Sequence, residues 1–259
     1  MTQSAVQRDT VYFISDIHLG AGYIADPASH ERKIADWLDS IRPHARELYI
    51  LGDALDYWYE YRTVVPRGFV RFFGALARLA DSGTRITWLK GNHDIWIFDY
   101  LPEEIGLEAI DGVADRIIDG KRFVMEHGDG AGEPRPSYRR MQKIFRNRFC
   151  QRLFAAIHPR WTVEFAHRWS SSSRMKGVRP PSRLYDDDRL VIFAKDYMAR
   201  LGHVDYFIFG HRHTPLTHSI APHTTLMILG ESFTRISYAT FRGGILELKS
   251  IDFRPVDPN

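Results

Sequence analysis

Five short polar segments in this chain combine the residue types that bind divalent metal ions. They are Asp16-Ile-His18, Gly52-Asp53-Ala-Leu-Asp56, Gly91-Asn92-His93-Asp94, His127-Gly-Asp129 and Gly210-His211-Arg-His213. Carboxylate and amide groups offer oxygen and imidazole offers nitrogen, a combination that suits Mn, Fe or Zn better than Ca. The segments predict seven metal ligands: Asp16, His18, Asp53, Asn92, His127, His211 and His213.

The number of candidate ligands predicts two metal ions. Seven protein ligands are too many for one small ion, and two ions need a group that bridges them. Asp53 is the predicted bridge, because a carboxylate has two oxygens and this one follows a predicted strand end and Gly52. Two metals roughly 3.5–4 Å apart can bind a hydroxide between them and hold a phosphoryl oxygen on each side. The pattern therefore predicts hydrolysis of a phosphate ester or anhydride.

Each polar segment follows an apolar run that predicts a strand. The runs are residues 11–15, 48–51, 85–89, 122–126 and 206–209. Loops at the carboxyl ends of strands in an open α/β sheet converge on one crevice. In an extended segment, positions i and i+2 point to the same side, so Asp16 and His18 can reach one site. The glycines before Asp53, Asn92 and His211 are expected to allow a sharp exit from the strand.

The remaining elements predict an α/β fold. Apolar spacing indicates helices over residues 30–41, from Pro66 to 82, and over 187–201 with an N-cap at Asp186 or Asp187. Residues 116–118 and 122–126 predict a hairpin across Asp119-Gly120. Residues 226–229, 235–241 and 245–251 alternate like antiparallel strands. Strands that alternate with helices in this way predict a sheet with a largely parallel start.

A basic and aromatic segment interrupts this pattern. Between Arg135 and Arg183 the chain has 13 Lys or Arg residues and one acidic residue, Glu164, although the net charge of the whole chain is only +3. An apolar stripe at helical spacing runs through Met141, Ile144, Phe145, Phe149, Leu153, Phe154 and Ile157, and Trp161, Phe165 and Trp169 follow. We expect a helical hairpin inserted into one domain that spans residues 1–259, with the insertion at 134–185. It could pack on the core, cover the site, or do both.

The composition of the chain indicates the class of protein and its expected location. Hydrophobic residues make up 44% of the 259 residues and charged residues 26%, as in ordinary globular proteins. The sequence shows no apolar run of the length that spans a bilayer and no apolar leader at its start, so a cytoplasmic protein is expected. The single cysteine, Cys150, excludes an intrachain disulfide.

The ordered motifs resemble the calcineurin-like metallophosphoesterase superfamily, whose pattern D-x-H, G-D-x-x-D, G-N-H-[DE], H-x-x, G-H-x-H matches from Asp16 to His213. The resemblance implies an α+β sandwich, in which two mixed β-sheets are flanked by helices. It implies that one metal binds Asp16, His18, Asp53 and His213, and that the other binds Asp53, Asn92, His127 and His211. It also implies that His93 is a catalytic residue that lies near the scissile phosphate and binds no metal.

A narrower likeness is to the UDP-2,3-diacylglucosamine diphosphatases of lipid A synthesis. The stretch Asp53-Ala-Leu-Asp-Tyr-Trp58 is similar to their GDxxDxW motif, and the basic insertion lies where they carry an acyl-chain-binding cap. The better-known members have Arg at the position of His93, and the chain is most similar to a Bacteroidetes-type branch that has His. This resemblance implies substrate contacts from Asn92, His93, Tyr138, Ser173 and Arg174.

The likeness also implies an activity and a location. The enzyme would release UMP and 2,3-diacylglucosamine 1-phosphate, with two divalent ions, Mn before Fe or Zn. It would act in the cytoplasm at the inner-membrane surface of a Gram-negative bacterium, with no nucleic-acid ligand and no obligate protein partner. Two alternatives stay open: a phosphodiesterase or nuclease of the same superfamily, and a non-catalytic metal-binding scaffold.

Overall fold

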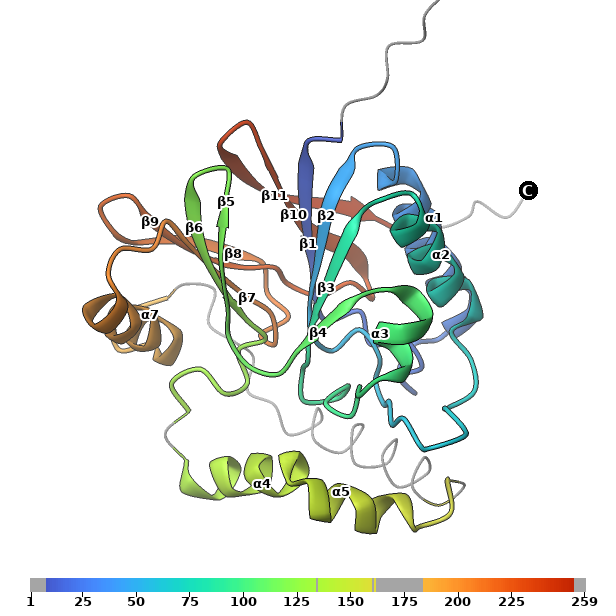
Figure 1. The fold of residues 1–259 in the computed structure, drawn as a ribbon. Coiled ribbons are helices and arrows are strands. Elements are labelled where there is room, and N and C mark those ends of the chain that lie inside the picture. Colours follow the sequence, from blue (N-terminus) through green and yellow to red (C-terminus); the bar gives the residue numbers. More distant parts are fainter. Residues whose placement is uncertain (1–7, 134, 160, 162–183, 254–259) are drawn as a thin grey trace, which may run out of the picture.

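The computed structural model describes residues 8–133, 135–159, 161 and 184–253, and its core is two packed β-sheets (Figure 1). The first sheet has the order β11-β10-β1-β2-β3-β4 and the second β5-β6-β7-β9-β8. The strands of the first sheet are β1 (Thr10–Ile14), β2 (Ala45–Leu51), β3 (Arg85–Leu89), β4 (Glu108–Ile110), β10 (Arg235–Arg242) and β11 (Ile245–Asp252). Those of the second are β5 (Ala114–Ile118), β6 (Lys121–Glu126), β7 (Tyr206–Phe209), β8 (Leu216–Ala221) and β9 (Thr224–Ile228).

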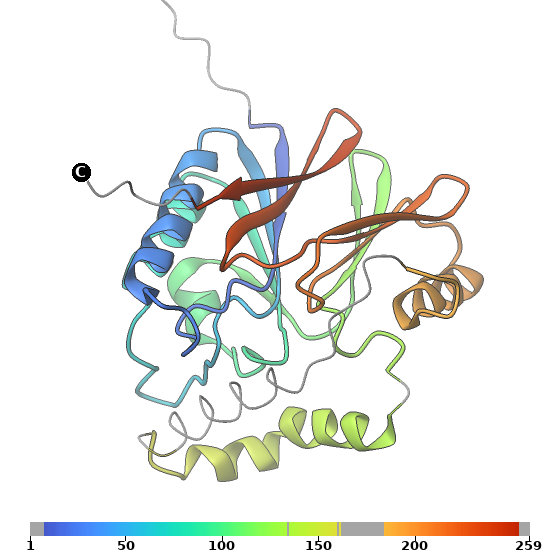
Figure 2. The same ribbon diagram turned by 180° about the vertical axis from the view of Figure 1, so that it is seen from behind.

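Both sheets are mixed, as expected for this sandwich. Strands β1 to β4 are parallel, and β10 pairs antiparallel with β1 and with β11. In the second sheet β6, β7 and β9 are parallel, whereas β5 and β8 are antiparallel edge strands. The prediction of antiparallel C-terminal strands is right for β10 and β11 (Figure 2) and wrong for the pairing of β9 with β7.

Helices cover the outer faces of the two sheets. Helices α1 (Pro27–Ile41), α2 (Val70–Asp81) and α3 (Tyr100–Ile105) lie on the first sheet, and α7 (Arg189–Leu201) lies on the second (Figure 1). Between the sheets, fully buried aromatic rings stack face to face: Phe13 packs on Tyr49 and on Phe123 with centroid distances of 5.3 and 5.7 Å. This apolar layer fixes the two sheets against each other, so the loops at their ends hold constant positions.

Three helix starts differ from the predictions. Helix α1 begins at Pro27, three residues before the predicted start, and the Asp26 side chain caps it. Helix α2 begins at Val70, not at Pro66, because Phe69 has a left-handed backbone (φ 62°) and Glu31 of α1 accepts hydrogen bonds from the backbone N–H of Arg71 and Phe72. Helix α7 has Asp188 as its N-cap, one or two residues after the predicted cap. A contact from outside the local sequence thus helps to fix the start of α2, whereas α7 is capped locally, because the Asp188 carboxylate accepts the backbone N–H of Leu190.

The basic segment forms two helices, α4 (Pro136–Arg146) and α5 (Arg148–Ala155), which lie across the carboxyl ends of the strands (Figure 1). Asn147 separates them because its extended backbone (ψ 120°) breaks the predicted continuous stripe, and its side chain caps α5. The two helices have no buried residue. The second half of the predicted hairpin, including Phe165 and Trp169, lies outside the described residues.

Part of the stripe does pack on the body. Trp96 stacks on Phe154 at 4.8 Å, contacts the ring of Phe145 at 5.6 Å, and donates from its indole N–H to the Phe145 carbonyl at 3.0 Å. The Tyr59 hydroxyl donates to the Gln151 carbonyl at 2.7 Å. The apolar side chains of Ile144, Phe149 and Leu153 are exposed, so packing accounts for only one face of these helices.

Candidate metal centre

The predicted ligands come from loops at one edge of both sheets. The loop after β1 supplies Asp16 and His18, the loop after β2 supplies Asp53, and the loop after β3 supplies Asn92. The loop after β6 supplies His127, and the loop after β7 supplies His211 and His213. The carboxyl ends of these parallel strands point toward α4 and α5 in Figure 1. The five motifs therefore converge at one place, as their order along the chain predicted.

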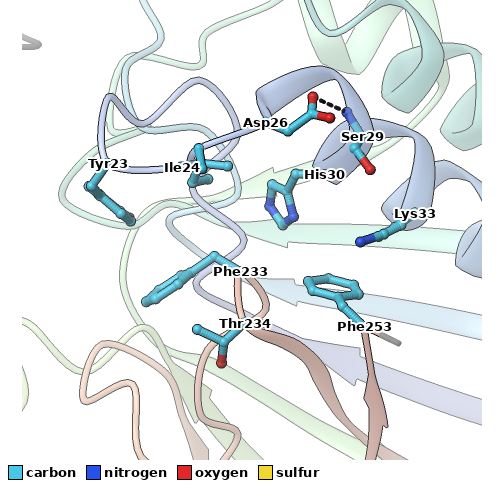
Figure 3. A pocket seen from close by; sticks show the side chains of 10 residues that line it. Tyr23, Ile24, Asp26, Ser29, His30, Lys33, Phe233, Thr234 and Phe253 are labelled. Atoms are coloured by element: carbon cyan, nitrogen blue, oxygen red, sulfur yellow. Dashed lines mark hydrogen bonds between the residues drawn. The ribbon is translucent and has the colours of Figure 1, made fainter. Parts of the chain in front are cut away.

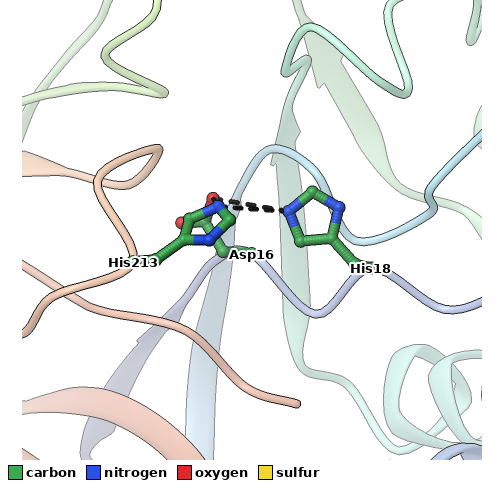
Figure 4. A group of neighbouring side chains, drawn as sticks. All are labelled: Asp16, His18 and His213. Carbon is green, nitrogen blue, oxygen red and sulfur yellow. Dashed lines mark hydrogen bonds and ion pairs between the residues drawn. The ribbon is translucent and has the colours of Figure 1, made fainter. Parts of the chain in front are cut away.

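A first group consists of Asp16, His18 and His213 (Figure 4). The Nε2 atoms of the two imidazoles are 3.3 Å apart, and Asp16 Oδ1 lies 3.1 Å from Nε2 of His213 and 3.8 Å from Nε2 of His18. The other Asp16 oxygen accepts the backbone N–H of His211 at 2.8 Å, which ties the loop after β7 to the loop after β1. Three ligand atoms thus converge within the span of one metal ion.

A second group consists of Asp53, His127 and His211. Nε2 of His127 lies 3.2 Å from Asp53 Oδ2 and 3.2 Å from the Asn92 side-chain oxygen. Its Nδ1 is 2.8 Å from the Leu51 carbonyl. Because a carbonyl can only accept, Nδ1 carries a proton and Nε2 is directed into the site. The ring of His211 is 5.1 Å from that of His127.

Asp53 lies between the two groups. Its Oδ2 is 3.2 Å from His127 of the second group and 3.7 Å from Nε2 of His18 in the first. Its Oδ1 accepts the backbone N–H of His93 at 2.9 Å, which fixes the carboxylate plane. This position suits the predicted bridging role, and no other carboxylate among the described residues approaches histidines of both groups in the same way.

The backbone around the site is unusual. Five of the predicted ligands have left-handed backbones: Asp16 (φ 51°), His18 (φ 51°), Asp53 (φ 54°), His211 (φ 67°) and His213 (φ 56°). Side chains with a Cβ rarely adopt this conformation, and it clusters at functional sites. It turns each side chain sharply out of its strand direction and into the common centre.

Two of the glycines act by leaving space. Gly91 and Gly210 do not have the positive φ expected of a sharp strand exit, unlike Gly52 (φ 79°). A Cβ on Gly91 would collide with Asp53, and one on Gly210 would come within 2.8 Å of Asp16 Oδ2. Neighbouring loops approach so closely here that only a residue without a side chain fits.

The chemistry of these residues fits a pair of divalent metal ions. Burial alone would raise the pKa of Asp16, but His213 and His18 hold it well below its usual value, so the carboxylate is ionised. Its buried Oδ1 makes no hydrogen bond with any residue that the structure describes. An ionised, buried carboxylate flanked by two imidazoles suits a bound metal cation, since a buried charge is costly unless it is paired.

The proton balance supports the same conclusion. Burial opposes charge on His127, yet the adjacent Asp53 carboxylate raises the pKa of this imidazole well above its usual value. Burial and the neighbouring His127 lower the pKa of His211 to about 4. The His127 ring therefore holds a proton where a metal ion would bind, whereas the His211 ring is neutral and has a lone pair available.

His93 lies at the edge of the centre and is partly exposed. Its Nδ1 is 2.9 Å from the backbone carbonyl of Asp56, so that nitrogen carries the proton and Nε2 faces the site, 3.9 Å from Asp53 Oδ2. The Asp56 carboxylate lies between the Nδ1 atoms of His93 and His18, at 3.6 and 3.5 Å. Asp94 instead accepts from the backbone N–H groups of Ala54 and Gly91 and braces the loops.

The predicted substrate contacts are only partly described. Asn92 and His93 lie at the centre. The hydroxyl of Tyr138 is 3.3 Å from Asp129 Oδ2, which Gln142 also contacts at 2.6 Å, so α4 begins beside the His127-Gly-Asp129 motif. Ser173 and Arg174 lie outside the described residues.

Two residues near the site were not predicted from the sequence. Arg212, between the two histidines of its motif, forms a bidentate pair with Asp188 at 2.6 and 2.7 Å and anchors the loop after β7 to α7. The ring of Phe233 lies 5.6 Å from His213 and 6.2 Å from His18. Neither partner is close in sequence, so no local pattern could show these contacts.

Comparison with known proteins assigns the chain to a family. The family model "Calcineurin-like phosphoesterase" matches residues 10–215, which include every predicted ligand. The chain belongs to this family. It is a metallophosphoesterase, and its two His/Asp groups are those of a dimetal hydrolase.

Relatives with assigned names share most of the chain. A UDP-2,3-diacylglucosamine hydrolase of Porphyromonas gingivalis is 40% identical over 95% of this chain and 98% of its own length. One from Ralstonia nicotianae is 30% identical over 80% of this chain and 78% of its own length. Among solved structures, a dimetal phosphatase from Danio rerio covers 95% of this chain and 99% of its own, with a TM-score of 0.44 and 14% identity.

Proposed function

We propose that this metallophosphoesterase hydrolyses the pyrophosphate of UDP-2,3-diacylglucosamine to UMP and 2,3-diacylglucosamine 1-phosphate in lipid A biosynthesis. The observation that carries the proposal is the 40% identity, over nearly the full length of both chains, to a hydrolase named for this substrate. The converging His/Asp groups supply a centre suited to the reaction. Bonds balance as in any hydrolysis: a water oxygen joins one phosphorus, and the P–O–P link breaks.

The metal centre rests on seven proposed ligands. One ion would be held by Asp16, His18, Asp53 and His213, and the other by Asp53, Asn92, His127 and His211. When bound, such a pair supplies a nucleophile at neutral pH and stabilises charge on phosphoryl oxygens. We propose Mn as the metal, since carboxylate, amide and imidazole ligands suit Mn, with Fe or Zn as alternatives.

His93 is the proposed catalytic residue outside the ligand set. Its Nδ1 is held by the Asp56 carbonyl, so Nε2 faces the centre with a fixed direction. Once Nε2 also takes up a proton, it can donate to a phosphoryl oxygen or give that proton to the departing phosphate. Asn92, Tyr138, Ser173 and Arg174 are proposed to contact substrate.

Product analysis tests the proposal. Protein loaded with Mn is incubated with UDP-2,3-diacylglucosamine, and UMP and the lipid phosphate are measured by mass spectrometry. We expect equal amounts of both products, with release abolished in Asp53→Ala and preserved in Asp36→Ala, an exposed aspartate of α1. Lipid phosphate without UMP, or no release by wild type that still cleaves an aryl phosphodiester, would contradict the substrate assignment.

The exposed residues of α4 and α5 indicate the surface on which the enzyme would encounter a lipid substrate. We propose that the insertion at 134–185 is a cap within a single domain and that it contacts the anionic surface of the inner membrane from the cytoplasmic side. Among the described residues, no helix is long and apolar enough to cross a membrane. Between residues 135 and 161, the described large apolar residues that are exposed are Ile144, Phe149, Leu153, Ile157 and Trp161, and exposed basic residues accompany them: Arg139, Arg140, Lys143, Arg148 and Arg152.

Apolar side chains with interspersed cations are the features of a helix that lies in an anionic membrane interface. Cosedimentation with vesicles of phosphatidylglycerol and phosphatidylethanolamine tests this contact. Phe149→Ser with Leu153→Ser is expected to lower the bound fraction several-fold, whereas Leu201→Ser, at a similarly exposed position of α7, leaves it unchanged. Equal binding by all three proteins would contradict the assignment.

The same basic residues favour one other candidate, a nuclease or phosphodiesterase of the same superfamily. Single-stranded DNA and RNA offered separately with Mn distinguish the two. Cleavage of a nucleic acid at a rate above that of the lipid substrate would favour the nuclease. An intact protein that retains no divalent ion after reconstitution would favour the non-catalytic scaffold.

A further inference from the structure

A surface pocket of about 360 Å³ lies beside the first turns of α1 (Figure 3). Its walls are the segment before α1, the first turns of α1, the loop between β9 and β10, and the residue after β11. Phe233 forms part of the wall, and its ring also contacts the rings of His18 and His213. The ring of Phe233 therefore contacts both the pocket and two of the predicted ligands.

The pocket offers aromatic surfaces beside a cation. The rings of Tyr23 and Phe233 meet edge to face at 5.4 Å. The Lys33 ammonium lies 4.5 Å above the ring of Phe253. Flat apolar faces with a nearby positive charge suit a planar heterocycle, since bases stack on aromatic rings and their carbonyl oxygens accept from cations.

His30 adds a specific polar group. It is only 4% exposed, and its Nε2 lies 2.9 Å from the Ile17 carbonyl, so Nε2 carries the proton. Nδ1 is therefore an acceptor, and it makes no hydrogen bond with any residue in the described part of the chain. Burial lowers the pKa of His30, which keeps the ring neutral. His30 lines the pocket, so a ligand that displaces the atoms covering Nδ1 could bring an N–H or O–H donor to this acceptor.

The loop that carries Phe233 is preorganised. The Glu231 carboxylate accepts from the backbone N–H of Phe233 at 2.6 Å and of Thr234 at 2.9 Å. The backbone N–H of Ser232 donates to the Asp16 carbonyl at 3.0 Å. The pocket wall is thus fastened to the same strand end that supplies the first metal ligands.

We propose that this pocket binds the pyrimidine nucleoside of the substrate, with the base against its aromatic walls and a base N–H or ribose hydroxyl near His30. The inference rests on the proposed function. The described contacts of α4 and α5 with the body involve Tyr59, Trp96, Asp111 and Asp129, none of which lines the pocket. The nucleotide half and the acyl chains of the substrate would therefore occupy different regions around the metal centre.

Binding of two product-like ligands tests the assignment. UMP and ribose 5-phosphate share the phosphate and the sugar, so the ratio of their dissociation constants, measured by calorimetry on the metal-loaded protein, isolates the contribution of the base. We expect wild type to prefer UMP by about tenfold or more, as stacking of one base allows. Lys33→Ala and Tyr23→Leu should each reduce this ratio several-fold. Arg32→Ala, an exposed neighbour on α1, should leave it unchanged.

The outcomes separate the two proposals. Equal affinity of wild type for UMP and ribose 5-phosphate would overturn the pocket assignment, and so would variants that keep the full ratio. If the wild-type protein releases no UMP from the sugar lipid while still preferring UMP to ribose 5-phosphate, the proposed substrate fails and the nucleoside pocket stands.

Discussion

Trp96 and Tyr59 are side chains of the metal-bearing body that contact the rings of α4 and α5, and removal of Trp96 should selectively impair action on a lipid. Trp96→Ala removes the two aromatic pairs that this ring makes with α4 and α5, to Phe145 and Phe154, and the hydrogen bond to the Phe145 carbonyl. Aromatic pairs contribute about 0.5–1.5 kcal/mol each and a hydrogen bond about 1 kcal/mol. The docking free energy should therefore fall by about 2–4 kcal/mol, which is about 30- to 1000-fold in the docking equilibrium.

The assay compares kcat/KM for the UDP sugar lipid with that for a small aryl phosphodiester. We expect a fall of about tenfold or more for the lipid and little change for the diester, because Trp96 is no part of the predicted centre. Phe154→Ala, from the opposite side of the contact, should reproduce the effect, and the double variant should show less than the sum of the two. Equal losses for both substrates would refute the reasoning, as would additive losses.

Three further predictions concern the centre and its supports. Because Asp53 raises the pKa of His127 well above its usual value, Mn binding at pH 7 should release about one proton and weaken as pH falls. Calorimetry in two buffers of different ionisation enthalpy detects this proton. Equal binding enthalpies in the two buffers would show that the ring was already neutral. The Glu60 carboxylate accepts hydrogen bonds from the backbone N–H groups at the start of α3. Glu60→Ala should therefore lower the free energy of unfolding, measured by urea titration, by about 3 kcal/mol or more. Glu104→Ala, at an exposed position of α3, is the control. Arg212→Lys breaks the bidentate pair with Asp188 and should weaken Mn retention several-fold in equilibrium dialysis, whereas unchanged retention would show that the pair does not position the loop.

The sequence predicted the strands that matter for the site because both signals are local. Buried runs such as Val11 to Ile14 are apolar throughout, and polar residues with strict spacing follow them. Since parallel strands share a carboxyl edge, the order of motifs was sufficient to predict convergence. The fold of the family and its dimetal character followed from the same residues.

The elements that the sequence did not predict depend on distant partners. Helix α3 has six residues, too few for a periodic signal, and Glu60 caps it from 40 residues away. Strand β8 is half exposed and half polar, and among the described strands it pairs only with β9. Whether β9 runs parallel to β7 is set by the path of the connecting chain, which side-chain alternation does not encode.

The left-handed backbones of five predicted ligands have a consequence for engineering. Each disfavours the folded chain by about 1 kcal/mol relative to glycine, because a Cβ crowds the backbone there. Replacing His211 or His213 by glycine should therefore make the metal-free fold more stable while removing a ligand. Selection of this protein for heat resistance alone would enrich such changes, so a thermostabilised library must hold these five positions constant and screen for retained metal.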